Sequence, residues 1–275
     1  MTDASAAEPE LLYDVAANVA TITMNRPHRR NAISTGMLRL LGEKLEEAEN
    51  DRDVRVVLLT GAGKGFCAGL DIKDAVAGTG IGGGGGGGSG GGGAASFMQT
   101  RNIPTVVLHE MDTPVIAVVN GAAAGYGLDL ALGCDIRIAA ESAKLLPGFA
   151  KRGVVPESGG TWYLPRLIGW AKAAEIGFLG RDLTAAEALE YGLVNKVVPD
   201  DEVMDEARQW AGEIAANAPL AITSMKRLFR HGLTEDFQSH THHVLLQTML
   251  LFGTADFREG LASFMEQRPP KFEGR

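Results

Sequence analysis

Two apolar runs in this chain each end in a segment of small residues, and this pattern limits the folds available to it. Residues 54–60 (VRVVLLT) lead into GAGKGFCAGLD at 61–71. Residues 115–119 (VIAVV) lead into NGAAAGYGLD at 120–129. Neither run alternates with polar residues, which is typical of a strand covered on both faces. A helical stretch at about 97–111 separates them, so the pattern predicts stacked β–α units.

The flanking sequence extends this pattern on both sides. Further strands are expected at 11–15 (LLYDV), 19–24 (VATITM), 135–139 (DIRIA) and 193–198 (LVNKVV). The first two surround the turn Ala16-Ala17-Asn18 and therefore predict a hairpin. A helix is expected to follow, with Ser34 or Thr35 as its N-cap.

From residue 170 onward, helical periodicity replaces most of the strand signal. Helices are expected over 201–216, from Pro219, and in two further segments up to Phe264. A helical tail with apolar faces packs either on its own core or on another subunit. We therefore predict an α/β core over residues 1–199 and a helical region over 200–275.

Residues 78–93 are unusual because thirteen of these sixteen residues are glycine. Such a segment buries too little surface to offset its backbone entropy, so a mobile loop is expected. A low-complexity insertion without function has the same composition. The segment directly follows the first of the two small-residue loops.

The bulk composition excludes several classes of protein. A net charge of −8 argues against nucleic acid as the main partner, because phosphate binding requires a basic surface. Cys67 and Cys134 are the only cysteines, which indicates reduced thiols and neither a disulfide framework nor a zinc site of the usual spacing. No apolar run approaches the length of a membrane span, and the N-terminus MTDASAAEPE is unlike a signal or transit peptide. A cytoplasmic location without membrane contact is expected.

The small residues of the two loops allow main-chain N–H groups to approach a ligand. A helix is expected to begin within 120–129, and its first N–H groups would be unpaired donors at the positive end of the helix dipole. Such donors stabilise a developing oxyanion. The alternative is that both loops have only a structural role. The first would then be a tight strand-to-helix connection with Asp71 as the N-cap, and the second would allow a helix and a strand to pack closely through Gly and Ala.

Several segments together carry a resemblance to a known family. They are RPHRRNAIS at 26–34, FCAGLDI at 66–72, PVIAVVNGAAAGYGLDLALGCDIRIA at 114–139, GVVPESGGTWYLPRLIG at 153–169 and FMEQRPPKFEGR at 264–275. Over nearly the whole chain they resemble the enoyl-CoA hydratase/isomerase (crotonase) superfamily. The resemblance implies an α/β fold, a crotonase-like (ClpP/crotonase) spiral of repeated ββα units with a C-terminal helical trimerisation region. It also implies a homotrimer or a dimer of trimers.

The family implies an acyl-CoA substrate and no cofactor. Its members hold the thioester carbonyl oxygen between two main-chain N–H groups, which we match to Ala68 and Tyr126. Further positions expected to contact CoA or substrate are Arg29, Arg30, Lys64, Gly69, Asp71, Ile72, Gly125 and Lys271. The cations among them are equally typical of a solvated surface.

The acids and bases beside the oxyanion hole decide which reaction follows enolate formation. Hydratases of this family use two glutamates; Asp129 stands at the first position and Phe149, which transfers no proton, at the second. Glu157 stands where the isomerases carry a single catalytic carboxylate. The resemblance therefore favours isomerisation of 3-enoyl-CoA to 2-enoyl-CoA, with Glu157 as the base that moves a proton from C2 to C4.

Other interpretations stay open. A hydratase in which Asp129 and Glu157 share the water is the first alternative. Asp129 equally suits the first turn of a helix, and Glu157 equally suits the approach to a helix at 160–167. A non-catalytic acyl-CoA-binding paralogue is a further alternative, as is a thioester hydrolase or dehalogenase of the same superfamily.

Two other groups of side chains are not expected to carry chemistry. His240, His242 and His243 occupy i, i+2 and i+3 positions, which converge poorly on one helix face, so no metal site is predicted. Cys67 lies beside the first loop, but no histidine is placed next to it by the sequence, so a thiol nucleophile is not expected.

Overall fold

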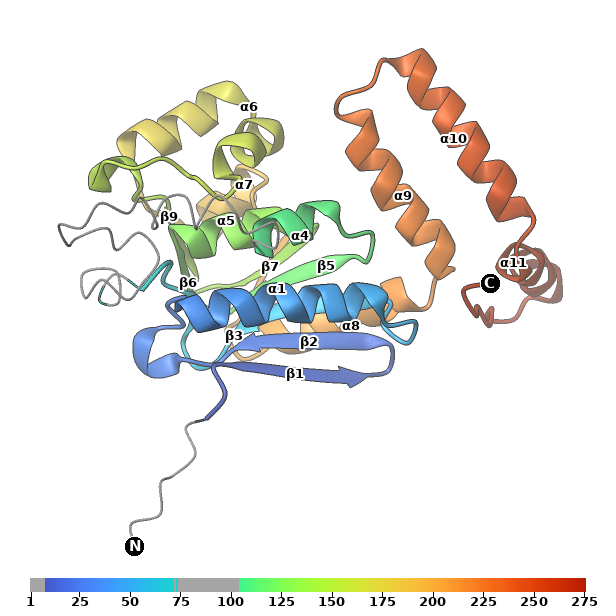
Figure 1. Ribbon diagram of the computed structural model, residues 1–275, viewed down its shortest axis with the longest axis horizontal. Coiled ribbons are helices and arrows are strands. Elements are labelled where there is room, and N and C mark those ends of the chain that lie inside the picture. The colour runs from blue at the N-terminus through green and yellow to red at the C-terminus, as the bar shows by residue number, and fades with distance from the viewer. Residues whose placement is uncertain (1–7, 72, 74–103) are drawn as a thin grey trace, which may run out of the picture.

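The computed structural model describes residues 8–71, 73 and 104–275 (Figure 1). Ile72, the Gly-rich segment 78–93 and the predicted helical stretch up to residue 103 lie outside the described residues. Strands and helices alternate up to residue 198, and the chain is mainly helical from Val203 to Glu266.

The chain begins with the predicted hairpin. Strands β1 (Leu11–Ala16) and β2 (Val19–Met24) pair antiparallel. The two residues between them, Ala17 and Asn18, have φ angles of 50° and 64°. Two consecutive positive φ angles define the turn whose twist matches a two-residue hairpin, so the prediction is confirmed.

The hairpin forms one edge of a six-stranded sheet with the order β1-β2-β3-β5-β7-β10. The remaining strands are β3 (Val56–Gly61), β5 (Val115–Val119), β7 (Ile136–Ala140) and β10 (Lys196–Val198). All neighbours beyond the hairpin pair in parallel. Every residue of β3 and β5 is buried, which explains why these runs show no alternation.

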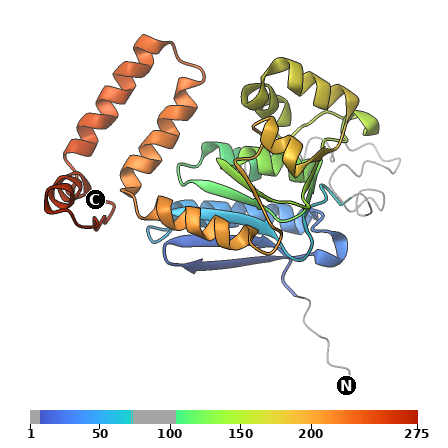
Figure 2. The same cartoon turned by 180° about the vertical axis from the view of Figure 1, so that it is seen from behind.

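Helices cover both faces of this sheet. Figure 1 shows α1 (Thr35–Asn50) in front of the strands, and Figure 2 shows α8 (Val203–Ala215) across the opposite face. Ser34 is the N-cap of α1, because its Oγ accepts the N–H of Met37 at 3.0 Å. The face of α8 that meets the sheet consists of Val203, Ala207, Ala211 and Ala215.

A second sheet of short strands, with the order β4-β6-β8-β9, was not predicted. Its strands are β4 (Gly65–Cys67), β6 (Ala122–Ala124), β8 (Lys144–Leu146) and β9 (Leu183–Thr184). Strands of two or three residues, several of them Gly or Ala, are too short to show periodicity in a sequence. Each of β3, β5 and β7 is followed by one of these short strands, so the core repeats a β–β unit.

Further helices lie around the second sheet. They are α4 (Pro104–Glu110), α5 (Tyr126–Gly133), α6 (Gly160–Leu179) and α7 (Ala185–Glu190), with 3-10 turns at Pro27–Arg29 and Ala150–Arg152. Helix α6 extends well beyond the expected 160–167 and is kinked at Gly169, whose φ is 75°. Helix α5 follows β6 directly, so its first residue lies just beyond the end of an inner strand of the second sheet.

The last helices project from the core as an arm (Figures 1 and 2). They are α9 (Pro219–Gly232), α10 (Phe237–Phe252) and α11 (Ala255–Glu266). Pro219 occupies the first turn of α9, as predicted. The division into residues 1–199 and 200–275 stays a prediction, since α8 lies on the sheet and only the later helices form the arm. None of the helices within the described ranges is long and apolar enough to cross a membrane.

Candidate active site

The two small-residue loops meet at the start of α5. Gly69 has a φ of 92°, and a Cβ placed on it would lie 2.8 Å from the carbonyl oxygen of Ala124 and 3.5 Å from the nitrogen of Tyr126. On the other side, a Cβ on Gly127 would overlap the main chain of Cys67. Only glycine permits both contacts, so the small residues bring two main-chain segments together.

Tyr126 is the first residue of α5, so its N–H has no acceptor within the helix. Its side chain is 2% exposed and points into the protein, where the hydroxyl lies beside Thr105. Burial, with the charges of Cys67, Asp129 and Glu157 adding to it, raises the pKa of Tyr126 well above its ordinary value. The phenol is therefore neutral.

The structure corrects the assignment of the other donor. The N–H of Ala68 donates to the carbonyl oxygen of Arg30 at 3.0 Å, so this group is already paired. Leu70 lies two residues further along and forms a parallel bridge with Ile33. In that bridge Ile33 N–H donates to Gly69 O and Asp71 N–H donates to Ile33 O. Because Gly69 O and Asp71 N–H both point toward Ile33, the N–H of Leu70, which lies between them, points away from Ile33.

A buried charged network supports this loop, and sequence reasoning missed its central residue. Arg26 is 8% exposed; its Nη1 lies 3.1 Å from Asp71 Oδ2 and its Nε lies 3.0 Å from Glu10 Oε1. Asp71 also accepts the N–H of Lys73 at 3.1 Å. The structure therefore places the Asp71 carboxylate in the support of the loop. Arg26 belongs to the segment RPHRRNAIS, which contributed to the family resemblance, but no contact was predicted for its side chain.

Asp129 is fully buried, with no exposed surface. Its Oδ2 accepts the N–H of Ser158 at 3.1 Å, and its Oδ1 lies beside the main chain of Gly160 without a hydrogen-bond partner among the described residues. The pKa of Asp129 is raised to about 7, mainly by burial and also by the charge of Glu157, while the main chain of Ser158 and Gly160 opposes the shift. This carboxylate thus faces the loop before α6 and not the solvent.

Glu157 is exposed and lines a cavity of about 260 Å³. The rest of the lining is Thr105, Val106, His109, Ser158, Gly159, Trp162 and Tyr163. Within the described part of the chain, Glu157 is the single carboxylate on this cavity. Its charge raises the pKa values of both Tyr126 and Asp129, so it lies close to the start of α5.

Aromatic rings form the far wall of the Glu157 cavity. The ring of Trp162 lies edge-to-face with those of His109 and Tyr163, each with centroids 5.0 Å apart. His109 Nδ1 lies 3.1 Å from the Tyr163 hydroxyl oxygen. Such contacts fix ring orientations, so the wall is a preorganised apolar surface with few polar atoms.

Phe149 is 7% exposed and lines a different, apolar cavity of about 310 Å³ together with Leu164 and Trp170. No ionisable side chain lines that cavity among the residues that the structure describes. Phe149, which we matched to the second acid of a two-glutamate hydratase, is therefore an apolar side chain turned toward apolar neighbours.

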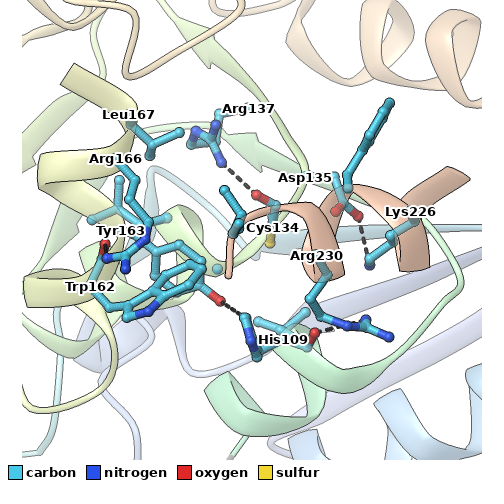
Figure 3. A pocket seen from close by; sticks show the side chains of 15 residues that line it. His109, Cys134, Asp135, Arg137, Trp162, Tyr163, Arg166, Leu167, Lys226 and Arg230 are labelled. Carbon is cyan, nitrogen blue, oxygen red and sulfur yellow. Dashed lines mark hydrogen bonds and ion pairs between the residues drawn. The ribbon is translucent and has the colours of Figure 1, made fainter. Parts of the chain in front are cut away.

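A further cavity of about 280 Å³ lies behind the aromatic wall and shares His109, Trp162 and Tyr163 with it. Figure 3 shows that the cations around it are already engaged. Lys226 Nζ lies 2.8 Å from Asp135 Oδ2, and Arg230 Nη1 donates to the carbonyl oxygen of His109 at 2.9 Å.

Arg137 also lines this second cavity and is buried. It donates to the carbonyl oxygens of Ala131, Cys134 and Leu193, and so satisfies the last turn of α5. Desolvation lowers its pKa from the ordinary value of arginine. These cations hold α9 and α5 in place and define no second reaction centre.

The other predicted contacts are less concentrated. Arg29 is partly exposed and Arg30 exposed at the turn that carries the Ala68 hydrogen bond, and Lys64 is exposed in the first loop. Gly125 is the N-cap residue of α5 with a φ of 51°. Lys271 is exposed in the tail after α11, where its N–H donates to Glu259 Oε1 at 2.7 Å. The contact predicted for Ile72 lies outside the described residues.

The histidines behave differently from the expectation. His240 and His243 do converge, together with His231, on the carboxylate of Glu235, at 3.2, 2.9 and 3.7 Å respectively. The convergence was missed because His231 belongs to α9 and the hairpin brings it to α10. No group of side chains suited to a metal ion is present in the described portion of the chain. Cys67 is buried, and desolvation raises the pKa of its thiol to about 12, which makes it a poor nucleophile.

Comparison with known proteins gives consistent matches over nearly the whole chain. Residues 14–275 match the enoyl-CoA hydratase/isomerase family. The chain is 38% identical to 1,2-epoxyphenylacetyl-CoA isomerase of Escherichia coli, over 96% of this chain and 98% of that protein. It is 35% identical to short-chain-enoyl-CoA hydratase of Clostridium acetobutylicum, over 96% of this chain and 97% of that one. The crystal structure of enoyl-CoA hydratase from Bacillus anthracis superposes with a TM-score of 0.88 at 34% identity, covering 97% of this chain and 100% of that one.

A core of repeated β–β units with two adjoining small-residue loops defines a crotonase-fold enzyme, and the predicted fold class is confirmed by these structural neighbours. This chain belongs to the enoyl-CoA hydratase/isomerase family. Its relatives are named as hydratases and as isomerases, so the family alone does not select the reaction.

Proposed function

We propose that this enzyme shifts the double bond of a 3-enoyl-CoA to give the 2-enoyl-CoA, with Glu157 as its single base. The observation that carries the proposal is the distribution of acids around the start of α5. Glu157 lines the cavity, Asp129 has no exposed surface, and the position of the second hydratase acid holds buried Phe149.

In the proposed reaction the thioester oxygen accepts hydrogen bonds from the N–H groups of Tyr126 and Leu70. Glu157 removes a proton from C2, and the electron pair delocalises over the dienolate, whose charge rests on the bound oxygen. The same carboxylic acid then delivers the proton to C4. No atom is gained or lost, and no cofactor takes part. Leu70 replaces Ala68 in this scheme because the N–H of Ala68 is paired with Arg30.

CoA would bind along the edge that carries the partly exposed Arg29 and the exposed Arg30 and Lys64. A polyanionic ligand requires such local cations, because the net charge of the chain is −8. Gly69 and Gly125 would then lie beside the thioester end. We propose that Lys271, in the tail after α11, reaches CoA held by a neighbouring subunit.

Hydration of a 2-enoyl-CoA is the second candidate, because relatives such as the Clostridium enzyme are named hydratases.

The aromatic wall formed by His109, Trp162 and Tyr163 favours a planar or cyclic acyl group. The Escherichia coli relative is named for an epoxyphenylacetyl group, which fits such a wall.

The test compares wild type, Glu157→Gln and Asp129→Asn on 3-enoyl-CoA and on 2-enoyl-CoA. Glu157→Gln keeps the shape of the side chain and removes the base, so isomerisation should fall by about 10²- to 10⁴-fold. Rapid loss of the conjugated thioester absorbance from 2-enoyl-CoA, abolished in Asp129→Asn, would establish the hydratase instead. Wild type and Glu157→Gln that are equally inert but still bind CoA esters would indicate a non-catalytic paralogue. Release of free CoA or of halide would identify a hydrolase or dehalogenase.

We also propose that the arm formed by α9–α11 packs against other copies of this chain in a homotrimer or a dimer of trimers. Phe229, Phe237 and Phe264 on this arm are 73%, 83% and 81% exposed in the single chain. Apolar side chains exposed to this degree over several turns are typical of an interface. Analytical ultracentrifugation should give the mass of three or six chains, and a monomer at micromolar concentration would refute the proposal. A cytoplasmic location stays a prediction.

A further inference from the structure

Helix α6 begins without an N-cap side chain of its own. Its N-cap is Gly159, with a φ of 108° and no side-chain hydrogen bond. The first N–H groups of a helix require acceptors when they are buried. Ser158 and Gly160 are both buried; the N–H of Ser158 donates to Asp129 Oδ2 from α5 at 3.1 Å, and Asp129 Oδ1 lies beside the main chain of Gly160. Asp129 therefore anchors, from α5, the main chain that leads into α6.

The contact between Asp129 and the start of α6 is closed to substrate. Asp129 has no exposed surface, and a Cβ on Gly160 would overlap its Oδ1. A carboxylate enclosed in this way cannot hold a water molecule against an acyl group in the Glu157 cavity. The Asp129 carboxylate instead contacts the main chain of the segment that carries Glu157.

We propose that Asp129 is a positioning residue that fixes the base Glu157 relative to the oxyanion donor Tyr126. The inference rests on the proposed function of Glu157. Glu157 directly precedes Ser158, whose N–H is bound by Asp129, and Asp129 lies one helical turn after Tyr126. One short path of bonds thus joins the base to the donor. No hydrogen bond or ion pair to the Glu157 carboxylate itself occurs within the described residues, so its position depends on this main-chain anchor.

The anchor is sensitive to protonation, because an ionised carboxylate is a stronger acceptor than a carboxylic acid. Burial raises the pKa of Asp129 to about 7. The titratable groups that face it are Glu157, from the loop before α6, and the hydroxyl of Tyr126, from α5. Of these, Glu157 carries the charge that disfavours ionisation of Asp129. Protonation of Asp129 near pH 7 weakens its hydrogen bond with the N–H of Ser158, so turnover falls as the pH is lowered through this value.

The experiment measures kcat and KM for isomerisation of a 3-enoyl-CoA between pH 5 and 9 in wild type, Asp129→Asn and Glu157→Gln. Asp129→Asn retains an acceptor oxygen but lacks the charge. We expect its kcat to fall by about 10- to 100-fold, the cost of a misplaced catalytic group, with KM changed less than threefold. The decline in kcat as the pH is lowered through about 7, expected in wild type, should be absent in Asp129→Asn. Amide hydrogen exchange at Ser158 should be faster than in wild type.

Asp256→Asn is the matched control. Asp256 is also buried, at 4% exposure, and accepts the N–H groups of Glu273 and Gly274 at 2.7 and 2.9 Å, far from Glu157. Its substitution should lower stability and leave both kcat and the dependence of kcat on pH unchanged. Because the bound N–H groups belong to the tail that carries Lys271, any effect on CoA binding should appear in KM alone. If Asp256→Asn shifts kcat and its dependence on pH as much as Asp129→Asn does, the effect is only structural and the proposal fails.

The remaining outcomes are also decisive. An Asp129→Asn enzyme with wild-type kcat and an unchanged dependence of kcat on pH, beside an inactive Glu157→Gln enzyme, overturns the positioning role alone. A Glu157→Gln enzyme as active as wild type overturns the assignment of the base, and the positioning role with it. Should Asp129→Asn not fold, Gly160→Ala perturbs the same contact from the other side and should give the same loss in kcat.

Discussion

If Leu70 and not Ala68 is the oxyanion donor, removal of the N–H at Leu70 should lower kcat, whereas removal of the N–H at Ala68 should lower stability. The perturbation replaces a single amide by an ester, by incorporating the α-hydroxy analogue of the residue, which removes the N–H and keeps the side chain. The structure gives Leu70 N–H no role in the bridge with Ile33, whereas Ala68 N–H donates to Arg30 O at 3.0 Å.

The magnitudes follow from these partners. Loss of one of two oxyanion donors costs about 10²- to 10³-fold in kcat, or about 2.7 to 4 kcal/mol. The ester at Leu70 should therefore lower kcat by this factor and leave the free energy of unfolding nearly unchanged. The ester at Ala68 leaves Arg30 O without its donor. Because both residues are exposed, this should cost about 0.5 to 1.5 kcal/mol of stability, with kcat close to wild type.

The assay follows the conjugated thioester formed from 3-enoyl-CoA, together with urea unfolding of each protein. The reasoning is refuted if the ester at Ala68 loses turnover while the ester at Leu70 retains it, since the paired N–H would then be the catalytic one. Equal losses in kcat at both positions would show that the loop as a whole, and not one donor, was disturbed.

Three further predictions concern stability. The pKa of Asp129 is raised from 3.8 to about 7, so the folded state binds this proton more tightly than the unfolded state. The free energy of unfolding should therefore fall as the pH rises between these values, by at most about 4 kcal/mol. Urea unfolding at pH 5 and pH 8 should show this loss in wild type and not in Asp129→Asn. Gly127→Ala places a Cβ against the main chain of Cys67 and should cost about 1 to 3 kcal/mol, seen as a lower urea midpoint. Ser34→Ala removes the cap that binds Met37 N–H and should cost about 1 kcal/mol in the same assay.

The long elements of the fold were predictable because periodicity and burial act over many residues. The strands at Val56–Gly61 and Val115–Val119, the cap at Ser34 and the proline at the start of α9 all follow from local preferences. The strands of the second sheet were not predictable, because a segment such as Ala122–Ala124 becomes a strand only through its neighbours in space.

The site was predictable to the level of the loops and not to the level of individual hydrogen bonds. The motif placed Glu157 and Tyr126 in one region. Whether Ala68 or Leu70 presents a free N–H depends on where Arg30 and Ile33 cross the loop, and these residues are distant in sequence. The role of Asp129 likewise depends on the start of α6, which the sequence does not bring next to α5.

Transfer of a deuterium label tests the central claim most directly. A 3-enoyl-CoA labelled at C2 is incubated with the enzyme in ordinary water, and the product is analysed by NMR and mass spectrometry. A single base acting on an enolate predicts 2-enoyl-CoA with part of the label at C4, and loss of this product in Glu157→Gln. A 3-hydroxyacyl-CoA as the product, or undiminished label transfer in Glu157→Gln, would contradict the account.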